Sequence, residues 1–188
     1  MADHVDLALE QWHARRPDLD VSAMAVIGRL KRLTRIAEAE LRRTFARHGL
    51  DAASFDVLAT LRRSDPPQRL TPAELMRASM VTSGAITQRL DRLEARGLVA
   101  RTPSAADGRV VHVALTDEGR ALIDQVLPDH LATEERLLAA LSPARRTELA
   151  DGLRELLESL GDGDGDGDGD GGGGRGRGRG RGFKGSAG

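Results

Sequence analysis

Two short helix signals stand directly before two short strand signals in residues 71–115, and this order limits the folds that the chain can adopt. Thr71 is followed by Pro72 at the first helical position and by Glu74 three residues later, a pattern that predicts a capped helix start. Ile86, Leu90 and Leu93 recur at helical spacing in the next run, which ends at Gly97. Two short helices joined by a few residues predict a helix-turn-helix.

The strand signals follow the second helix without a break. Residues 98–101 and 110–115 have strand character, and the segment 103–108 between them predicts a turn. Val111, Val113 and Leu115 alternate, as expected for a strand with one buried face. We therefore predict a mainly α protein with a small β-hairpin wing, which is a winged helix-turn-helix.

Longer helices are expected on both sides of this segment. Ser22 is predicted to cap a helix that ends at Gly49, and another helix is predicted from Asp51 to a point before Pro66. Two further stretches follow Thr116, one with Pro128 inside it, which is expected to bend or interrupt the helix. The last helix is expected to start at the pair Ser142-Pro143. The leucines of these terminal helices indicate either contact with a second chain or packing within the chain.

Composition supports this class and excludes several others. Hydrophobic residues make up 39% of the 188 residues and aromatic residues 2%, so the core consists of the aliphatic side chains usual in helices. The absence of cysteine excludes disulfides and thiol-based redox sensing. The five histidines are scattered, with no metal-ligand or nucleophile–base spacing, so we expect neither an enzyme nor a metal or cofactor. No secretory or membrane segment is recognised, which predicts a cytoplasmic protein.

Charge is distributed unevenly along the chain. Arginines outnumber acidic residues between positions 62 and 109, and acidic residues predominate between 117 and 160. A basic centre suits a surface that binds phosphate, although a mixed solvated surface gives the same count. Residues 161–188 alternate glycine with aspartate and then with arginine, and are expected to be disordered. Their Arg-Gly end either contacts nucleic-acid phosphate or has no specific function.

The start of the second short helix carries the expected DNA contacts. The N–H groups at Thr82, Ser83 and Gly84 can meet a DNA phosphate or a groove edge, because a helix N-terminus attracts anions. Thr87 and Gln88, one turn later, can reach base edges. For any one of these residues alone, ordinary capping or solvent exposure is the better interpretation, and DNA contact is favoured because all of them precede a wing.

Arginines complete the expected DNA-binding set. Arg92 lies one turn beyond Gln88 and is included in it. In the wing, Asp107 is expected to order the loop and direct Arg109 into the adjacent minor groove. A carboxylate two residues before an arginine is common in turns, so this motif is weak by itself.

The runs QRLDRLEARGLVAR and DGRVVHVALTDEGR resemble the winged-helix core of the MarR family, and the similarity extends over about residues 21–160. The resemblance implies an obligate homodimer, two recognition helices in successive major grooves and a palindromic operator in double-stranded DNA. It also implies the expected organisation of the chain: an N-terminal extra helix in 1–20, a dimerisation helix in 21–50, the winged helix-turn-helix in 51–116, C-terminal dimerisation helices in 117–160 and the tail in 161–188.

A narrower resemblance is to the urate-responsive branch of that family, the HucR and PecS type. The ligand-binding positions of that branch match Trp12, Asp56, Arg89 and Arg101. A tryptophan can stack on a flat heteroaromatic ring, and arginines can hold an anionic edge by forked hydrogen bonds. Asp56 is expected to pair with Arg89 and to be repelled when an anion arrives. Alternatively, Trp12 is a packing anchor, Asp56 a surface residue and both arginines phosphate contacts.

These expectations predict a ligand-responsive repressor released by a small anionic ligand, with urate as the first candidate. Xanthine, aconitate and a phenolic carboxylate are alternative ligands. A ligand-independent architectural nucleic-acid-binding protein is the alternative function.

Overall fold

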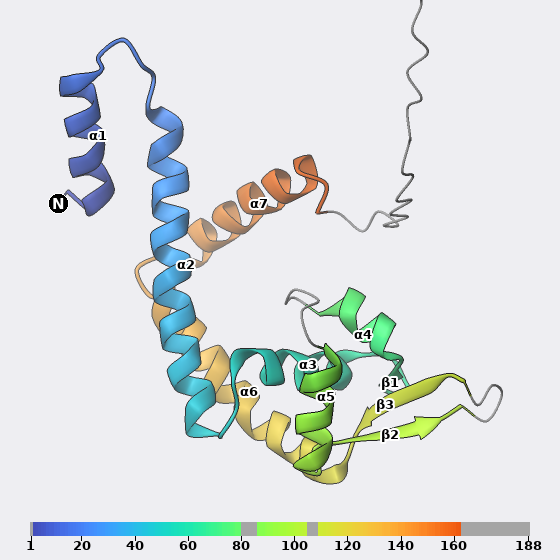
Figure 1. Ribbon diagram of the computed structural model, residues 1–188. Helices are drawn as coiled ribbons and strands as arrows, with labels where there is room; N and C mark the ends of the chain where they lie inside the picture. The colour runs from blue at the N-terminus through green and yellow to red at the C-terminus, as the bar shows by residue number, and fades with distance from the viewer. Residues whose placement is uncertain (1, 80–85, 105–108, 163–188) are drawn as a thin grey trace, which may run out of the picture. The chain divides into compact units, whose positions relative to one another are not determined.

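The computed structural model describes residues 2–79, 86–104 and 109–162 of the chain. It divides into two compact units, Met1–Ala140 and Leu141–Gly188. The first unit contains six helices and a small antiparallel sheet in its described residues, so the predicted mainly α fold with a β wing is confirmed (Figure 1).

The first two helices pack against each other. Helix α1 (His4–Arg15) begins at a capping box in which Asp3 and Asp6 each accept a backbone N–H of the other. Helix α2 (Ser22–Arg47) lies beside it, and Arg29 of α2 forms ion pairs with both aspartates. Val5 is buried against Gly28, where an added Cβ would lie 3.2 Å from Val5. Polar and apolar contacts together hold α1 to α2.

The expected cap at Ser22 is wrong. Ser22 is the first residue of α2, and Val21 occupies the N-cap position without a side-chain hydrogen bond. The backbone N–H of Ser22 is accepted instead by the carboxylate of Asp20. The carboxylate of Asp20 therefore accepts a backbone N–H at the start of this helix, as a serine cap would.

The three helices that follow agree with the prediction wherever the described residues test a predicted start or end. Helix α3 (Ala52–Arg63) is capped by Asp51, and α4 (Pro72–Ala78) begins at the predicted capping box of Thr71 and Glu74. Helix α5 (Ile86–Ala95) is followed by Gly97, whose φ of 69° places it in the left-handed region. The predicted DNA contacts Thr82, Ser83 and Gly84 lie outside the described residues.

The wing is one strand larger than predicted. Strands β2 (Val99–Pro103) and β3 (Val111–Leu115) form the expected hairpin, with Arg101 opposite Val113. Strand β1 (Arg69–Leu70) pairs with the other edge of β3, giving the order β1-β3-β2. Two residues are too few to show an alternating pattern, so sequence periodicity could not predict β1. The sheet connects the start of the helix-turn-helix to the wing.

Helix α6 (Asp117–Leu137) continues through Pro128, so the expected interruption of the helix is wrong, whereas the bend expected as its alternative stays a prediction. Ile123 and Val126 before the proline and Thr133 after it are all buried, so packing holds both halves of the helix to the unit. The hydroxyl of Thr133 lies 2.8 Å from that of Thr44 on α2, and both threonines are almost completely buried.

One hydrophobic core joins the helix-turn-helix to α6 and the sheet. Its largest fully buried side chains come from α3, α4, α5 and α6: Leu58, Leu61, Leu75, Leu90, Leu93 and Ile123. Gly119 in the first turn of α6 lies against the backbone of Leu98, and an added Cβ would overlap the Leu98 carbonyl oxygen. The wing root, which is the backbone at Leu98 just before β2, therefore meets α6 at a position that requires glycine.

The second unit contains helix α7 (Pro143–Ser159). Ser142 caps it as predicted, since its side chain accepts the N–H of Arg145. Four leucines of this segment are exposed, at positions 149, 156, 157 and 160. Residues 163–188, predicted to be disordered, lie outside the described residues. Within the described part of the chain, no helix is long and apolar enough to cross a membrane.

Candidate DNA-binding surface and ligand pocket

Helix α5 turns its polar side to solvent. Leu90 and Leu93 are buried in the core, whereas Thr87, Gln88 and Arg92 are exposed. The spacing of the two leucines fixes the rotation of the helix, so the predicted DNA contacts lie on the outer side. A helix of this kind, followed by a wing, can enter a major groove.

Arg101 of β2 bonds to three positions along one side of α5. Its Nη1 lies 2.7 Å from Oδ1 of Asp91 and 2.9 Å from Oε2 of Glu94, and its Nη2 donates to the carbonyl of Thr87 at 3.3 Å. The backbone N–H of Arg101 also donates to Glu94. The side chain is only 25% exposed. These contacts tie the recognition helix to the wing.

A second arginine, directly after α5, connects the end of that helix to the corner between α2 and α3. Arg96 donates from Nη1 to the carbonyl of Gly49, at the corner between α2 and α3, over 2.9 Å. The predicted wing contact Arg109 is exposed. Its expected partner Asp107 lies outside the described residues, so the ordering of the wing loop by this carboxylate stays a prediction.

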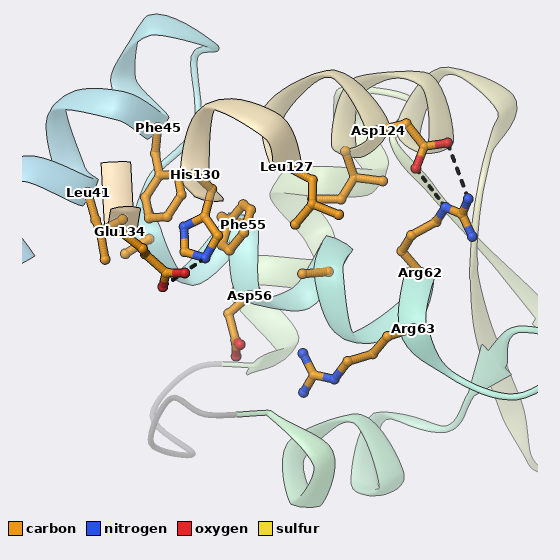
Figure 2. A pocket seen from close by; sticks show the side chains of 13 residues that line it. Leu41, Phe45, Phe55, Asp56, Arg62, Arg63, Asp124, Leu127, His130 and Glu134 are labelled. Carbon is orange, nitrogen blue, oxygen red and sulfur yellow. Dashed lines mark hydrogen bonds and ion pairs between the residues drawn. The ribbon is translucent and has the colours of Figure 1, made fainter. Parts of the chain in front are cut away.

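A cavity of about 650 Å³ lies among α2, α3 and α6 (Figure 2). One wall is aromatic: Phe45 and Phe55 stack with ring centroids 4.3 Å apart, and the His130 ring lies 4.6 Å from that of Phe55. Leucine, isoleucine and alanine side chains line much of the remainder. The volume is in the range of small-molecule sites, and an apolar cavity with a few charged groups is their usual composition.

Charged side chains from α3 and α6 border this cavity. Arg62 forms an ion pair with Asp124 at 2.7 Å, and Nε2 of His130 lies 3.2 Å from Oε1 of Glu134. Asp56 is buried, with 8% of its surface exposed. Figure 2 shows the Asp56 carboxylate and the Arg63 guanidinium pointing toward the same part of the cavity.

Of the four predicted ligand residues, Asp56 alone lines this cavity as the described residues define it. Trp12 lines a separate cavity of about 360 Å³ between α1 and α2, together with Lys31 and Arg32. Within one chain, therefore, the structure does not bring Trp12 and Asp56 to the same cavity. Arg101 lies against α5, as described above.

Arg89 on α5 acts electrostatically on the start of α3. Burial alone would raise the pKa of Asp51, but hydrogen bonds from Ser54 and the positive charges of Arg89 and Arg92 hold that pKa below its ordinary value. An aspartate that caps α3 is thus coupled to the recognition helix. The expected pairing of Arg89 with Asp56 stays a prediction.

Sequence reasoning missed most of the cavity. Neither Phe45 nor Phe55 was predicted to line a site, and His130 was set aside as one of five scattered histidines. The signal that could have found the two phenylalanines is their position along the chain. Phe45 stands near the end of one predicted helix, and Phe55 stands near the start of the next. Nothing in the sequence places His130 beside them.

The comparisons with known proteins agree with this architecture. The model of the MarR family matches residues 48–110. The HTH-type transcriptional regulator PecS of Dickeya dadantii (strain 3937) is 40% identical over 151 residues, which cover 79% of this chain and 91% of PecS. The chain belongs to the MarR family. It is thereby a DNA-binding transcriptional regulator of the winged helix-turn-helix type and not an enzyme.

Two solved MarR-like structures are informative neighbours. Sco3205, a MarR family transcriptional regulator from Streptomyces coelicolor solved in complex with DNA, is 26% identical with a TM-score of 0.69, over 76% of this chain and 93% of that one. BpsR of Bordetella bronchiseptica, whose DNA binding is regulated by 6-hydroxynicotinic acid, is 29% identical with a TM-score of 0.63, over 74% of this chain and 94% of that one.

Proposed function

We propose that this MarR family protein is a homodimeric repressor that binds a palindromic operator and is released by a small anionic ligand, with urate as the first candidate. The observation that carries the proposal is the cavity of about 650 Å³ with the buried Asp56 in its wall, in the unit that also contains the recognition helix. The ligand-dependent DNA binding of BpsR supports a ligand response in a protein of this architecture.

Exposed apolar residues support the dimer. Helices α1 and α2 expose Leu7, Met24, Val26, Ile27 and Ile36, each between 47% and 53% of its surface. Large exposed apolar areas are uncommon on a monomer and mark interaction sites. We propose that these helices and α7 form the dimer interface, which places two copies of α5 on one palindrome. Sedimentation of the purified chain at micromolar concentration tests this, and a single monomeric species would contradict it.

The chemistry of the cavity supports a flat, partly polar ligand. A ring can stack on the wall of Phe55 and His130, and N–H or O–H groups on it can donate to the Asp56 carboxylate. Urate and xanthine have such donors, whereas aconitate lacks the ring. A phenolic carboxylate combines a ring with one donor, and it remains an alternative ligand.

The decisive experiment measures operator release. Fluorescence anisotropy with labelled DNA from upstream of the protein's own gene, with and without millimolar urate, should show roughly tenfold weaker binding with urate, a usual size for coupling between two sites. Asp56→Asn should keep the DNA affinity and lose the response. Unchanged DNA affinity with urate would remove urate as the ligand, and 6-hydroxynicotinate and xanthine would then be tested in the same assay.

Trp12, Arg89 and Arg101 are proposed as further ligand contacts from outside this cavity. The Trp12→Phe variant removes only the indole, because it keeps an aromatic ring in α1 and leaves the other three residues intact. If Trp12 contacts urate, quenching of its fluorescence should follow urate occupancy, because it is the sole tryptophan of the chain. Quenching that is absent while DNA is still released would limit the ligand to the cavity of Asp56.

A further inference from the structure

Arg63, the last residue of α3, lies between two cavities. It lines the cavity of about 650 Å³ described above and also a second one of about 470 Å³ formed by the turn between α3 and α4. Its Nη2 donates to the carbonyl of Ala78 over 2.7 Å, and Ala78 is the last residue of α4. One side chain thus joins the wall of the proposed ligand cavity to the end of the first helix of the helix-turn-helix.

The charges around the cavity distinguish Arg63 from its neighbour Arg62. Arg62 is paired with Asp124, and His130 lies against Glu134. Arg63 forms no ion pair in the part of the chain that the structure describes, and the partner it does have is the neutral carbonyl of Ala78. A guanidinium carries five N–H donors in a planar fork that suits a carboxylate or a similar anionic edge.

We propose that Arg63 binds the anionic edge of the ligand and gives up its hydrogen bond to Ala78 in doing so, so that ligand binding loosens the end of α4. The inference rests on the proposed function, because it requires a ligand in this cavity. An ion pair between a guanidinium and an anion is stronger than the hydrogen bond of the guanidinium to a neutral carbonyl, so an anion that uses the Nη2 of Arg63 displaces Ala78.

The length of α4 makes it sensitive to this exchange. The helix has seven residues, and a helix this short is not stable by itself in water. The last carbonyls of any helix lack partners within the helix, and Arg63 supplies one of them here. Leu75 is buried in the core and its carbonyl accepts the hydroxyl of Ser79, but Met76, Arg77 and Ala78 are exposed, so the bond from Arg63 is one of few contacts at the final turn.

The geometry also defines the ligand more closely. The Asp56 carboxylate points toward the same part of the cavity as Arg63, so a purely anionic edge would be repelled there (Figure 2). A suitable ligand has an anionic edge for Arg63 and an adjacent N–H or O–H for Asp56. Urate carries both groups on adjoining ring positions, whereas 6-hydroxynicotinate has its hydroxyl across the ring from the carboxylate. Benzoate carries the anionic edge alone and should bind at least tenfold more weakly than urate.

Calorimetric titration of the full-length protein with urate tests the contact. Arg63→Ala should weaken urate binding at least tenfold, and Arg63→Lys, which keeps the charge and loses the fork, should fall between it and the wild type. Arg69→Ala is the matched control, because this exposed arginine lines the second cavity and not the first. The urate affinity of this variant should stay within twofold of the wild type. Equal affinities of Arg63→Ala and wild type would overturn the inference.

Hydrogen exchange followed by mass spectrometry tests the link to α4. Urate should speed amide exchange in residues 75–79 of the wild type, and Arg63→Ala should show the faster exchange without urate. Unchanged exchange in that variant would overturn the inference. A wild type that binds neither urate nor 6-hydroxynicotinate would overturn the proposed function together with the anion contact, whereas a wild type and an Arg63→Ala variant that release DNA equally with urate would overturn this inference alone.

Discussion

Arg101 of the wing and Asp91 of the recognition helix form an ion pair in which Nη1 lies 2.7 Å from Oδ1, and the same nitrogen lies 2.9 Å from Oε2 of Glu94. Two carboxylates on successive turns of α5 thus share one guanidinium from β2. The pair connects the two elements that we propose to contact different grooves of the same DNA. It also neutralises negative charge on a helix that must approach phosphates.

We therefore expect Arg101→Ala to weaken operator binding about tenfold, through lost orientation of α5 and uncovered acidic charge. Arg101→Lys should recover part of the affinity, since it retains the charge and not the fork. Asp91→Asn with Glu94→Gln tests the ion pairs from the other side, and anisotropy with operator DNA is the measurement. If Arg101 is a ligand contact alone, Arg101→Ala will bind DNA normally and only the response to urate will change.

The buried hydroxyl pair of Thr44 and Thr133 should contribute measurably to stability. Thr44→Val leaves the hydroxyl of Thr133 without its partner from α2, and a change of this kind costs about 1–3 kcal/mol. Thr133 keeps its contacts with Asp129 and Arg136, which favours the lower end of that range. Urea unfolding followed by circular dichroism measures the difference. A Thr44→Val variant as stable as the wild type would show that the hydroxyl pair is energetically neutral.

Gly119→Ala should prevent normal folding of the wing root. The new methyl group would overlap the Leu98 carbonyl, a backbone atom that cannot move without shifting β2 or α6, and we expect a loss of about 3 kcal/mol or more. Gly152→Ala in α7 is the control, because nothing lies within 4 Å of its added Cβ and a helix interior favours alanine by about 1 kcal/mol. Thermal unfolding should therefore shift in opposite directions in the two variants.

The docking of α1 on α2 should weaken at acidic pH. The pKa of Asp6 is lowered by its hydrogen bond from the Asp3 backbone and by Arg29, and the pKa of Asp3 is lowered by the backbone of Asp6 and by the same arginine. Carboxylates with depressed pKa values stabilise the folded state fully above the unfolded value of about 3.9, and this contribution is lost as the pH falls through the lower folded value.

Trp12 reports this docking directly, since it is the sole tryptophan and lies on α1. Its fluorescence anisotropy should fall below about pH 4 in the wild type. Arg29→Ala should show lower anisotropy already at pH 7. A steady signal in both proteins would mean that the apolar contact of Val5 with Gly28 holds α1 without the ion pairs.

The helices could be predicted where a local signal marks them. The Thr71 capping box and Gly97 act within one turn of chain, so the start of α4 and the end of α5 could be predicted from the sequence. Pro128 does not interrupt α6, because packing of the helix on both sides of it overrides the local preference of proline. The short strand β1 was missed because its single reason to exist is a partner more than forty residues away in sequence, Val113 and Ala114 of β3.

The candidate site was less predictable than the fold. Asp56 was found through a resemblance, and its position in a cavity wall fits a ligand contact. Arg63 was not found, because the carbonyl that it contacts is a backbone group and leaves no mark in the sequence. The contact of Arg101 with α5 likewise depends on the register of β2 with β3. Turn geometry determines this register, and the composition of the strands does not.

The strand order β1-β3-β2 also affects how the protein behaves in concentrated solution. Strand β3 has a neighbour on both sides, one outer strand has two residues, and the other ends in Pro103, which has no N–H to offer. Long unpaired edges recruit strands from other molecules and start aggregation, and the described sheet has little such edge to offer. Changes that lengthen β1 or replace Pro103 would create one, so an altered wing with new DNA preferences is best built by keeping both.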